Sequence, residues 1–319
     1  MSWFTFSFND FAVSFLSVLF EGIPFLLLGS LVSGLVDVFV PAEKMQRLMP
    51  KNPAAAIFAS GLLGLIFPMC ECGSVIVIRR FIRKGLPVSC AVTYMLGAPI
   101  VSPIVALSTF AAFRGQNPWL MTSLRLGIGF LIAVGVGFIV RQISLAKLLQ
   151  PGVLNESANN RRTGVSIAVE PGAPDFADIA ANSGLGRKLV FAIQSATADF
   201  LDVAFFLVIG TAITSVFNTA VDRSIIDPLA TNPPLAILSM MGLAAAIALC
   251  STTDAFVAAS FTMFPFAAKL AFLLFGPVFD LKLFWLYGLV FKRRWVVALA
   301  LALFTVIAFI SWRIAALNL

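Results

Sequence analysis

Long apolar stretches alternate with short polar or basic stretches along almost the whole chain. A helix that crosses a membrane needs about 20 predominantly apolar residues, and eight segments of that length or more can be recognised. They are residues 11–40, 54–78, 85–113, 118–140, 189–218, 234–260, 264–291 and 295–317. This pattern predicts an all-α polytopic membrane protein.

The first four segments and the last four share a pattern, at an offset of 179 to 181 residues. The matching positions are Gly29 with Gly210, Asn52 with Asn232, Pro53 with Pro233, Cys70 with Cys250, and Gly97 with Gly276. We therefore expect two homologous repeats. The N-terminal membrane repeat would cover residues 1–140, a polar linker 141–188, and the C-terminal membrane repeat 189–319.

Two segments in each repeat carry residues that interrupt a helix. Pro68 and Gly73 flank a cysteine motif in the first repeat, and Gly97 is followed by Pro99 and Gly276 by Pro277. Backbone groups freed by such breaks cannot face lipid, so they are buried in protein or line a polar cavity. Interrupted helices at corresponding places of two repeats indicate the substrate site of a transporter. We expect the breaks to converge on one central site.

The basic residues near the segment ends discriminate between two topologies. If all eight segments cross the membrane, the connections carry ten Lys and Arg on one side and eight on the other. If segments 54–78 and 234–260 are re-entrant hairpins, the division is sixteen against two, which the positive-inside rule prefers. The repeats would then be inverted, with broken or re-entrant helices at the core. Arg79 and Arg80 follow the first motif so closely that they must snorkel or face protein, unless the tip of the hairpin lies away from the membrane centre.

The composition excludes several classes of protein. With 60% hydrophobic and 12% charged residues the chain is not a soluble domain, which carries about a quarter charged residues. The net charge of +7 follows the positive-inside pattern, so no nucleic-acid partner is expected. No Lys or Arg precedes the first apolar run, so no signal peptide is expected. Four cysteines are too few for a disulfide framework. Because there is no histidine, metal or proton chemistry would rely on thiols and carboxylates.

Three of the four cysteines are predicted to bind the substrate or a soft metal. Cys70 and Cys72 cannot easily form a disulfide, because the ring between positions i and i+2 is strained. Together with Cys250 of the second repeat they offer soft donors to a thiophilic ligand. The alternative is that they are small buried hydrophobic residues, the usual role of free cysteine. For Cys90, which has no match in the other repeat, we expect packing.

Acidic residues inside apolar segments are the other candidates. Glu21 and Asp202 match across the repeats, and Asp199 lies on the helix face of Asp202, so these acids could carry protons or bind a coupling cation. The alternative is a structural bond to an intramembrane base such as Lys282, Arg125 or Lys269. Lys282 itself is expected only to neutralise a nearby acid, either Asp254 or Asp280. The predicted substrate-binding residues are Cys70, Glu71, Cys72, Gly97, Pro99, Cys250, Asp254, Gly276, Pro277 and Asp280.

Four stretches of the sequence together resemble the predicted-permease family that includes the ArsP-type organoarsenical efflux permeases. They are Pro68–Gly73 (PMCECG), Tyr94–Ile100 (YMLGAPI), Cys250–Phe256 (CSTTDAF) and Gly276–Lys282 (GPVFDLK). The similarity extends over nearly the whole chain in the same order, except for the linker. It implies a multi-pass permease of the bacterial inner membrane, commonly drawn with eight spans. Some members export trivalent organoarsenicals.

These observations favour a permease with a central site formed by both repeats, which alternates its access by rocking. Its substrate would be a trivalent organoarsenical, a soft metal ion or a small sulfur compound. We expect no cofactor and no enzymatic activity, with the lipid bilayer as the surroundings and a homo-oligomer as one form of assembly. An intramembrane thiol oxidoreductase is the alternative, but the spacing of Cys70 and Cys72 disfavours it. A third class is a non-transporting subunit or scaffold, for which duplicated helix breaks would be costly.

Overall fold

The computed structural model describes residues 8–39, 50, 52–67, 69–83, 85–150, 185–220 and 232–317. Over these residues the regular elements are helices, apart from one isolated bridge between Leu149 and Phe291. Four of the described helices are long and apolar enough to cross a membrane. They are α1 (Phe8–Phe39), α7 (Pro118–Gln142), α11 (Leu185–Ala220) and α16 (Arg293–Ala316). The prediction of a helical membrane protein is confirmed for this part of the chain.

Each of the other four predicted segments is split into two shorter helices. In the first repeat these are α3 (Pro53–Ile66) with α4 (Glu71–Arg83), and α5 (Val88–Gly97) with α6 (Pro103–Ala112). In the second they are α12 (Pro233–Ile247) with α13 (Thr253–Ser260), and α14 (Phe266–Phe275) with α15 (Leu281–Tyr287). The breaks fall at the predicted motifs, although Pro68 itself lies outside the described residues.

Local residues explain where these helices begin and end. The side chain of Asn52 accepts a hydrogen bond from the Ala54 N–H at 3.0 Å, and Pro53 occupies the first turn, where its missing N–H costs nothing. α12 ends at Ala248, whose φ of 49° is left-handed and unfavourable for a residue with a Cβ. This strained end leaves the Ala248 carbonyl free of the helix ladder at the centre of the molecule.

Contacts between connections show which helix ends lie together. Between α6 and α7, Gln116 donates to the Ala259 carbonyl at 3.3 Å and accepts from Lys269 Nζ at 2.7 Å. The short helix α8 (Leu145–Leu148) lies beyond the other end of α7. Its last residue, Leu148, accepts a backbone hydrogen bond from Lys292 N at 2.9 Å, and Gln150 N donates one to the Val290 carbonyl at 3.1 Å, so this part of the chain contacts the α15–α16 connection. The first residues of the predicted linker are therefore ordered and packed. The α6–α7 and α13–α14 connections share one end of the bundle, and those after α7 and α15 share the opposite end.

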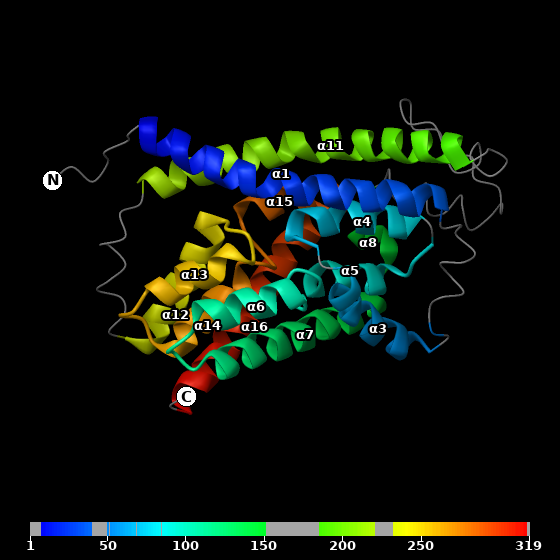
Figure 1. Ribbon diagram of the computed structural model, residues 1–319. Helices are drawn as coiled ribbons and strands as arrows, with labels where there is room; N and C mark the ends of the chain where they lie inside the picture. Colours follow the sequence, from blue (N-terminus) through cyan, green and yellow to red (C-terminus); the bar gives the residue numbers. More distant parts are fainter. Residues whose placement is uncertain are drawn as a thin grey trace.

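The split segments differ in how they run through the bundle (Figure 1). α3 begins and α4 ends at the same end of the molecule, so the two form a hairpin whose turn points inward. α12 begins and α13 ends at the opposite end, with their turn also directed toward the middle. The two hairpin turns, one between α3 and α4 and the other between α12 and α13, thus enter the core from opposite ends.

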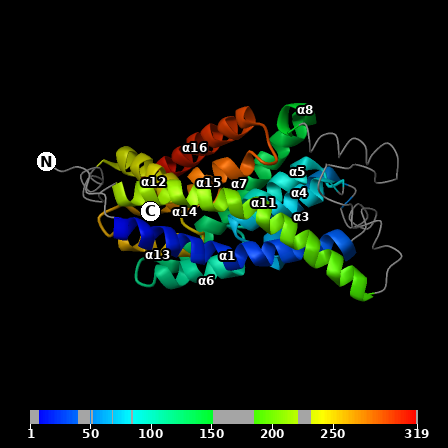
Figure 2. The ribbon, with the colours of Figure 1, turned by 90° about the horizontal axis from the view of Figure 1, so that it is seen from above.

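α1 and α11 form an antiparallel pair over one face of the shorter helices (Figures 1 and 2). Gly34 lies against Ala192 and Ala196, whereas Gly22, nearer the start of α1, faces Leu207 further along α11. The pair packs on α4 and α15 through the matching glycines of the two repeats. A Cβ on Gly29 would lie 3.0 Å from the Gly73 Cα, and one on Gly210 would lie 2.8 Å from the Lys282 Cβ.

Candidate functional site

A cysteine precedes the second helix of each hairpin: Cys70 lies directly before α4, and Cys250 lies three residues before α13. The Cys70 carbonyl accepts the first helical hydrogen bond of α4 from Ser74 N at 3.0 Å, and its thiol accepts one from Gly73 N at 3.3 Å. In α13 the Cys250 carbonyl accepts from Asp254 N, also at 3.0 Å. Helices usually begin with Ser, Thr, Asp or Asn, because oxygen accepts hydrogen bonds better than sulfur does. Capping therefore does not explain the two thiols, since oxygen would serve better at Cys70 and the N-cap of α13 is Thr252.

The predicted thiol ligands are buried and form no disulfide bond. Cys70, Cys72 and Cys250 are 8%, 4% and 9% exposed. Within the described residues, no group of three or more Cys, Asp or Glu side chains is arranged to hold a metal ion. Binding of a soft ligand by all three thiols stays a prediction. Cys90 is buried inside α5, among residues that pack against α3 and α7.

Glu71, between the two cysteines, forms a buried ion pair with the second repeat. Lys282 Nζ lies 3.0 Å from Glu71 Oε1, and it also donates to the Ala248 carbonyl at 3.0 Å. Asp280 is near as well, with Oδ2 at 3.5 Å from the same nitrogen. Its other oxygen caps α15 by accepting from Leu283 N at 2.6 Å. Lys282 therefore meets two carboxylates, and the expectation that it neutralises a nearby acid is confirmed.

A second buried pair joins α7 to α13. One terminal nitrogen of Arg125 lies 2.9 and 2.7 Å from the two carboxylate oxygens of Asp254 and donates to the Ser251 carbonyl at 2.9 Å. The other terminal nitrogen donates to Thr109 Oγ1 at 2.7 Å. The Arg125 side chain is fully buried, and that of Asp254 is 2% exposed. A charge so deeply buried is tolerated only with such partners, because removing an ion from water costs several kcal/mol.

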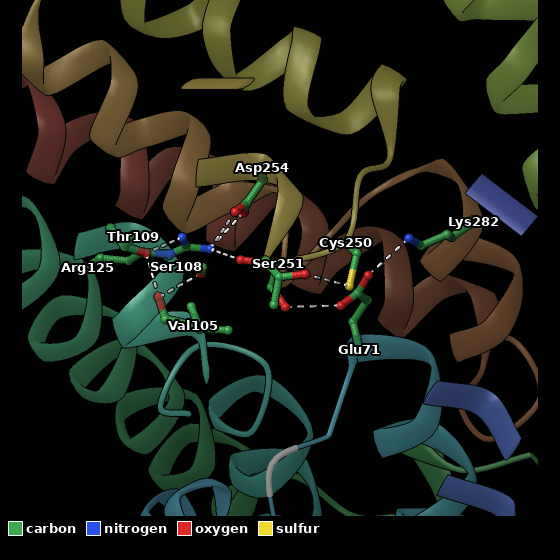
Figure 3. A network of polar contacts seen from close by, with 10 residues as sticks. Glu71, Val105, Ser108, Thr109, Arg125, Cys250, Ser251, Asp254 and Lys282 are labelled. Atoms are coloured by element: carbon green, nitrogen blue, oxygen red, sulfur yellow. Dashed lines mark hydrogen bonds and ion pairs between the residues drawn. The ribbon is translucent and has the colours of Figure 1, made fainter. Parts of the chain in front are cut away.

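Ser251 connects the two pairs into one network (Figure 3). Its hydroxyl donates a long hydrogen bond of 3.4 Å to Glu71 Oε2, while its carbonyl accepts from Arg125. Figure 3 shows the resulting path from Lys282 through Glu71 and Ser251 to Arg125, with the Cys250 thiol beside Glu71. The hairpin turns and the α15 break thus meet in one buried polar centre.

A third ion pair lies outside this centre. Arg80 Nε is 2.7 Å from Asp199 Oδ2, and the same oxygen accepts a hydrogen bond from the Ser33 hydroxyl at 2.9 Å. Both charged side chains are 11% exposed. Of the alternatives expected for Arg80, the structure shows the side chain facing protein. This triad ties α1, α4 and α11 together, and the role of Asp199 in ion coupling stays a prediction.

The remaining predicted residues lie elsewhere. Gly97 is at a helix contact, where a Cβ would be 3.3 Å from the Gly61 carbonyl oxygen, and one on Gly276 would be 3.7 Å from the Ala244 Cβ. Both glycines let the broken helices approach α3 and α12. Pro99 and Pro277 follow them in the same two breaks. Glu21 and Asp202 belong to α1 and α11, but their side chains lie outside the part of the chain that the structure describes.

Four residues of the network were not among the predicted site residues. Lys282 and Arg125 carried a signal, because each is a charged residue inside an apolar segment. Ser251 and Thr109 carried none, since hydroxyl residues are common in membrane helices and usually bond to their own backbone. Thr109 does so here, donating to the Val105 carbonyl at 2.7 Å while it accepts from Arg125.

Comparison with known proteins agrees with a membrane transport function. A family model described as "Predicted permease" matches residues 7–315. The chain is 35% identical over 284 residues to UPF0718 protein YcgR of Bacillus subtilis (strain 168), covering 88% of this chain and 89% of that one. It is 32% identical over 283 residues to a Streptococcus mutans (serotype c, strain ATCC 700610 / UA159) protein named "Putative two-component membrane permease complex subunit", covering 88% and 87%. No solved structure matches.

Proposed function

The chain belongs to the predicted permease family, and from that premise we propose that it carries a small thiophilic solute through the buried polar centre. The solute is a trivalent organoarsenical, a soft metal ion or a small sulfur compound. The membrane is the bacterial inner membrane, as the family resemblance implies. The name of the Streptococcus mutans relative supports an assembly with another membrane subunit, and a homo-oligomer is the alternative assembly.

The observation that carries this proposal is that Cys70 and Cys250 lie at matching places in the two halves of the chain. They match at an offset of 180 residues, each precedes the second helix of a hairpin, and both are buried beside the Glu71 network. Thiols are the soft donors of proteins and select soft ligands over hard ones. Cys72 lies on the same helix turn as Cys70, which gives the site a third sulfur.

We also propose that the two repeats are inverted and alternate access by rocking. The hairpins entering from opposite ends support this arrangement, as do the sixteen basic residues that it places on one side. Contacts across the repeats support it further. Helix α4 packs on α15, and α13 packs on α6, which is the counterpart of α15 in the first half. Each hairpin therefore closes on the broken helix of the other repeat, which is the arrangement of inverted-repeat transporters.

Serine substitution of single cysteines tests the substrate class. Phenylarsine oxide, Cd²⁺ and thiosulfate serve as probes, with thermal stabilisation of the purified protein as the binding readout. We expect C70S, C72S and C250S to lose most of the stabilisation and transport in proteoliposomes, because serine keeps the size but not the soft donor. C90S is the matched control and should behave as wild type. If the four variants behave alike, the site is not thiol-based.

Coupling to protons is proposed for Glu21, Asp202 and Asp199. An intramembrane carboxylate is costly and is usually kept for ion movement. E21Q or D202N should retain probe binding but lose accumulation against a gradient, since an amide cannot cycle a proton. The variant D199N tests whether Asp199, the partner of Arg80, also takes part in proton coupling. Unchanged pH-driven transport in all three variants would show that these carboxylates are structural.

A further inference from the structure

The ammonium group of Lys282 occupies a cage of oxygen atoms. Three oxygens surround its nitrogen: Glu71 Oε1 at 3.0 Å, the Ala248 carbonyl oxygen at 3.0 Å, and Asp280 Oδ2 at 3.5 Å. Glu71, Asp280 and Lys282 are 2%, 0% and 4% exposed. We propose that the two carboxylates and this carbonyl form a site for an alkali cation, and that the protein fills the site permanently with its own lysine.

The composition of the cage is that of a metal-ion site. Carboxylate and backbone carbonyl oxygens are the ligands that hard cations prefer. The carbonyl is freed by the left-handed end of α12 at Ala248, and unwound carbonyls next to half-helices coordinate Na⁺ in transporters. A plain salt bridge would need one carboxylate. Here a second one is buried, and Asp280 Oδ2 has no hydrogen bond, only the ammonium at 3.5 Å.

The position of the cage means that the Lys282 ammonium, a cation attached to the chain, also holds parts of the fold together. Glu71 belongs to the first repeat, whereas Ala248, Asp280 and Lys282 belong to the second, so the ammonium holds the α4 hairpin to the broken α15. α11 rests on the same residue, because Gly210 packs against the Cα and Cβ of Lys282. A cation fixed to the chain keeps these contacts without any dissolved ion. The inference is independent of whether the substrate is thiophilic.

Removing the lysine should convert the cage into a real ion site. We expect K282A to unfold at a lower temperature in choline chloride and to be stabilised by Na⁺, Li⁺ or K⁺ at equal ionic strength. The rise should be saturable and reach roughly 5–10 °C at a cation concentration about 100 times the Kd. Wild type should unfold at the same temperature in all these salts.

Three further variants make the result specific. K282A/E71Q and K282A/D280N should lose the cation-dependent rise, because each removes one charged ligand. K269A is the matched control: Lys269 is also a buried lysine, 5% exposed, but its ammonium contacts the neutral Gln116. It should lose stability equally in every salt.

The outcomes separate clearly. A rise for K282A that depends on both carboxylates supports the cation cage, and equal unfolding temperatures of K282A in all salts overturn it. If K282A cannot be isolated in any salt, the neutral variant E71Q/D280N/K282M decides. Recovery of this neutral variant as folded protein supports a cage whose carboxylates require a cation. Failure of the neutral variant to fold overturns the proposal.

Discussion

Removing Asp254 while keeping Arg125 should strongly destabilise the protein. In D254A the guanidinium stays fully buried with only the Thr109 hydroxyl and the Ser251 carbonyl as partners. Loss of one partner from a buried ion pair costs about 3–5 kcal/mol, because an uncompensated charge remains in a dry interior. The partly exposed pair of Arg80 and Asp199, with side chains 11% exposed, should cost less, roughly 1–3 kcal/mol for D199A.

The double variant R125M/D254A separates charge from packing. It removes both charges, and Thr109 stays satisfied because its hydroxyl still donates to the Val105 carbonyl. The remaining loss is the hydrogen bond to the Ser251 carbonyl, worth about 1–3 kcal/mol. The double variant should therefore be more stable than D254A alone.

Denaturant unfolding in micelles, followed by the fluorescence of the five tryptophans, gives the free energy of unfolding of each variant. With the single variant R125M added, D254A, R125M/D254A and wild type form a double-mutant cycle, from which the coupling energy of the pair is obtained. Two results would refute the reasoning. One is a cost of D254A below about 1 kcal/mol, and the other is a double variant whose loss equals the sum of the single losses.

Two other predictions follow from helix contacts and topology. G29A should destabilise the protein by about 1–3 kcal/mol and impair transport, because its Cβ would meet the backbone at the start of α4. G135A, in α7 with nothing within 4 Å, should be neutral or stabilising in the same unfolding assay. Single reporter cysteines at Asn52 and Pro87, in a background without the native cysteines, should be labelled by an impermeant reagent from the same side, and one at Gln116 from the other. Labelling of Asn52 and Pro87 from opposite sides would exclude the hairpin and restore eight crossings.

Much of the fold was predictable because membrane helices are specified locally. The apolar segments and their breaks follow from runs of hydrophobic residues and from Pro and Gly, which act on the backbone within a turn. The predicted segments begin at residues 54 and 234, next to Asn52–Pro53 and Asn232–Pro233. The helices α3 and α12 begin within one residue of these positions. The lysines and arginines of the connections between the apolar segments were decisive for the hairpin prediction. Two of them, Lys51 and Lys84, lie outside the described residues.

The partners within the site were less predictable, because they depend on packing between distant segments. Glu71 and Lys282 are 211 residues apart in sequence, and no periodicity relates them. Lys282 was expected to neutralise Asp254 or Asp280, but its shortest carboxylate contact is Glu71, and Asp254 belongs to Arg125 instead. The interior of a membrane protein offers several acids of similar burial, and only the rotation of each helix decides which base each one meets.

The ion pairs of Arg80 with Asp199, Arg125 with Asp254, and Lys282 with Glu71 each join the first half of the chain to the second. Neither half is therefore an independent unit, because each would leave buried charges without counterions. If the chain were cut within its polar linker and the two fragments made together, they would be expected to recognise one another inside the bilayer. The two halves of the polypeptide thus depend on each other for the counterions of their buried charges.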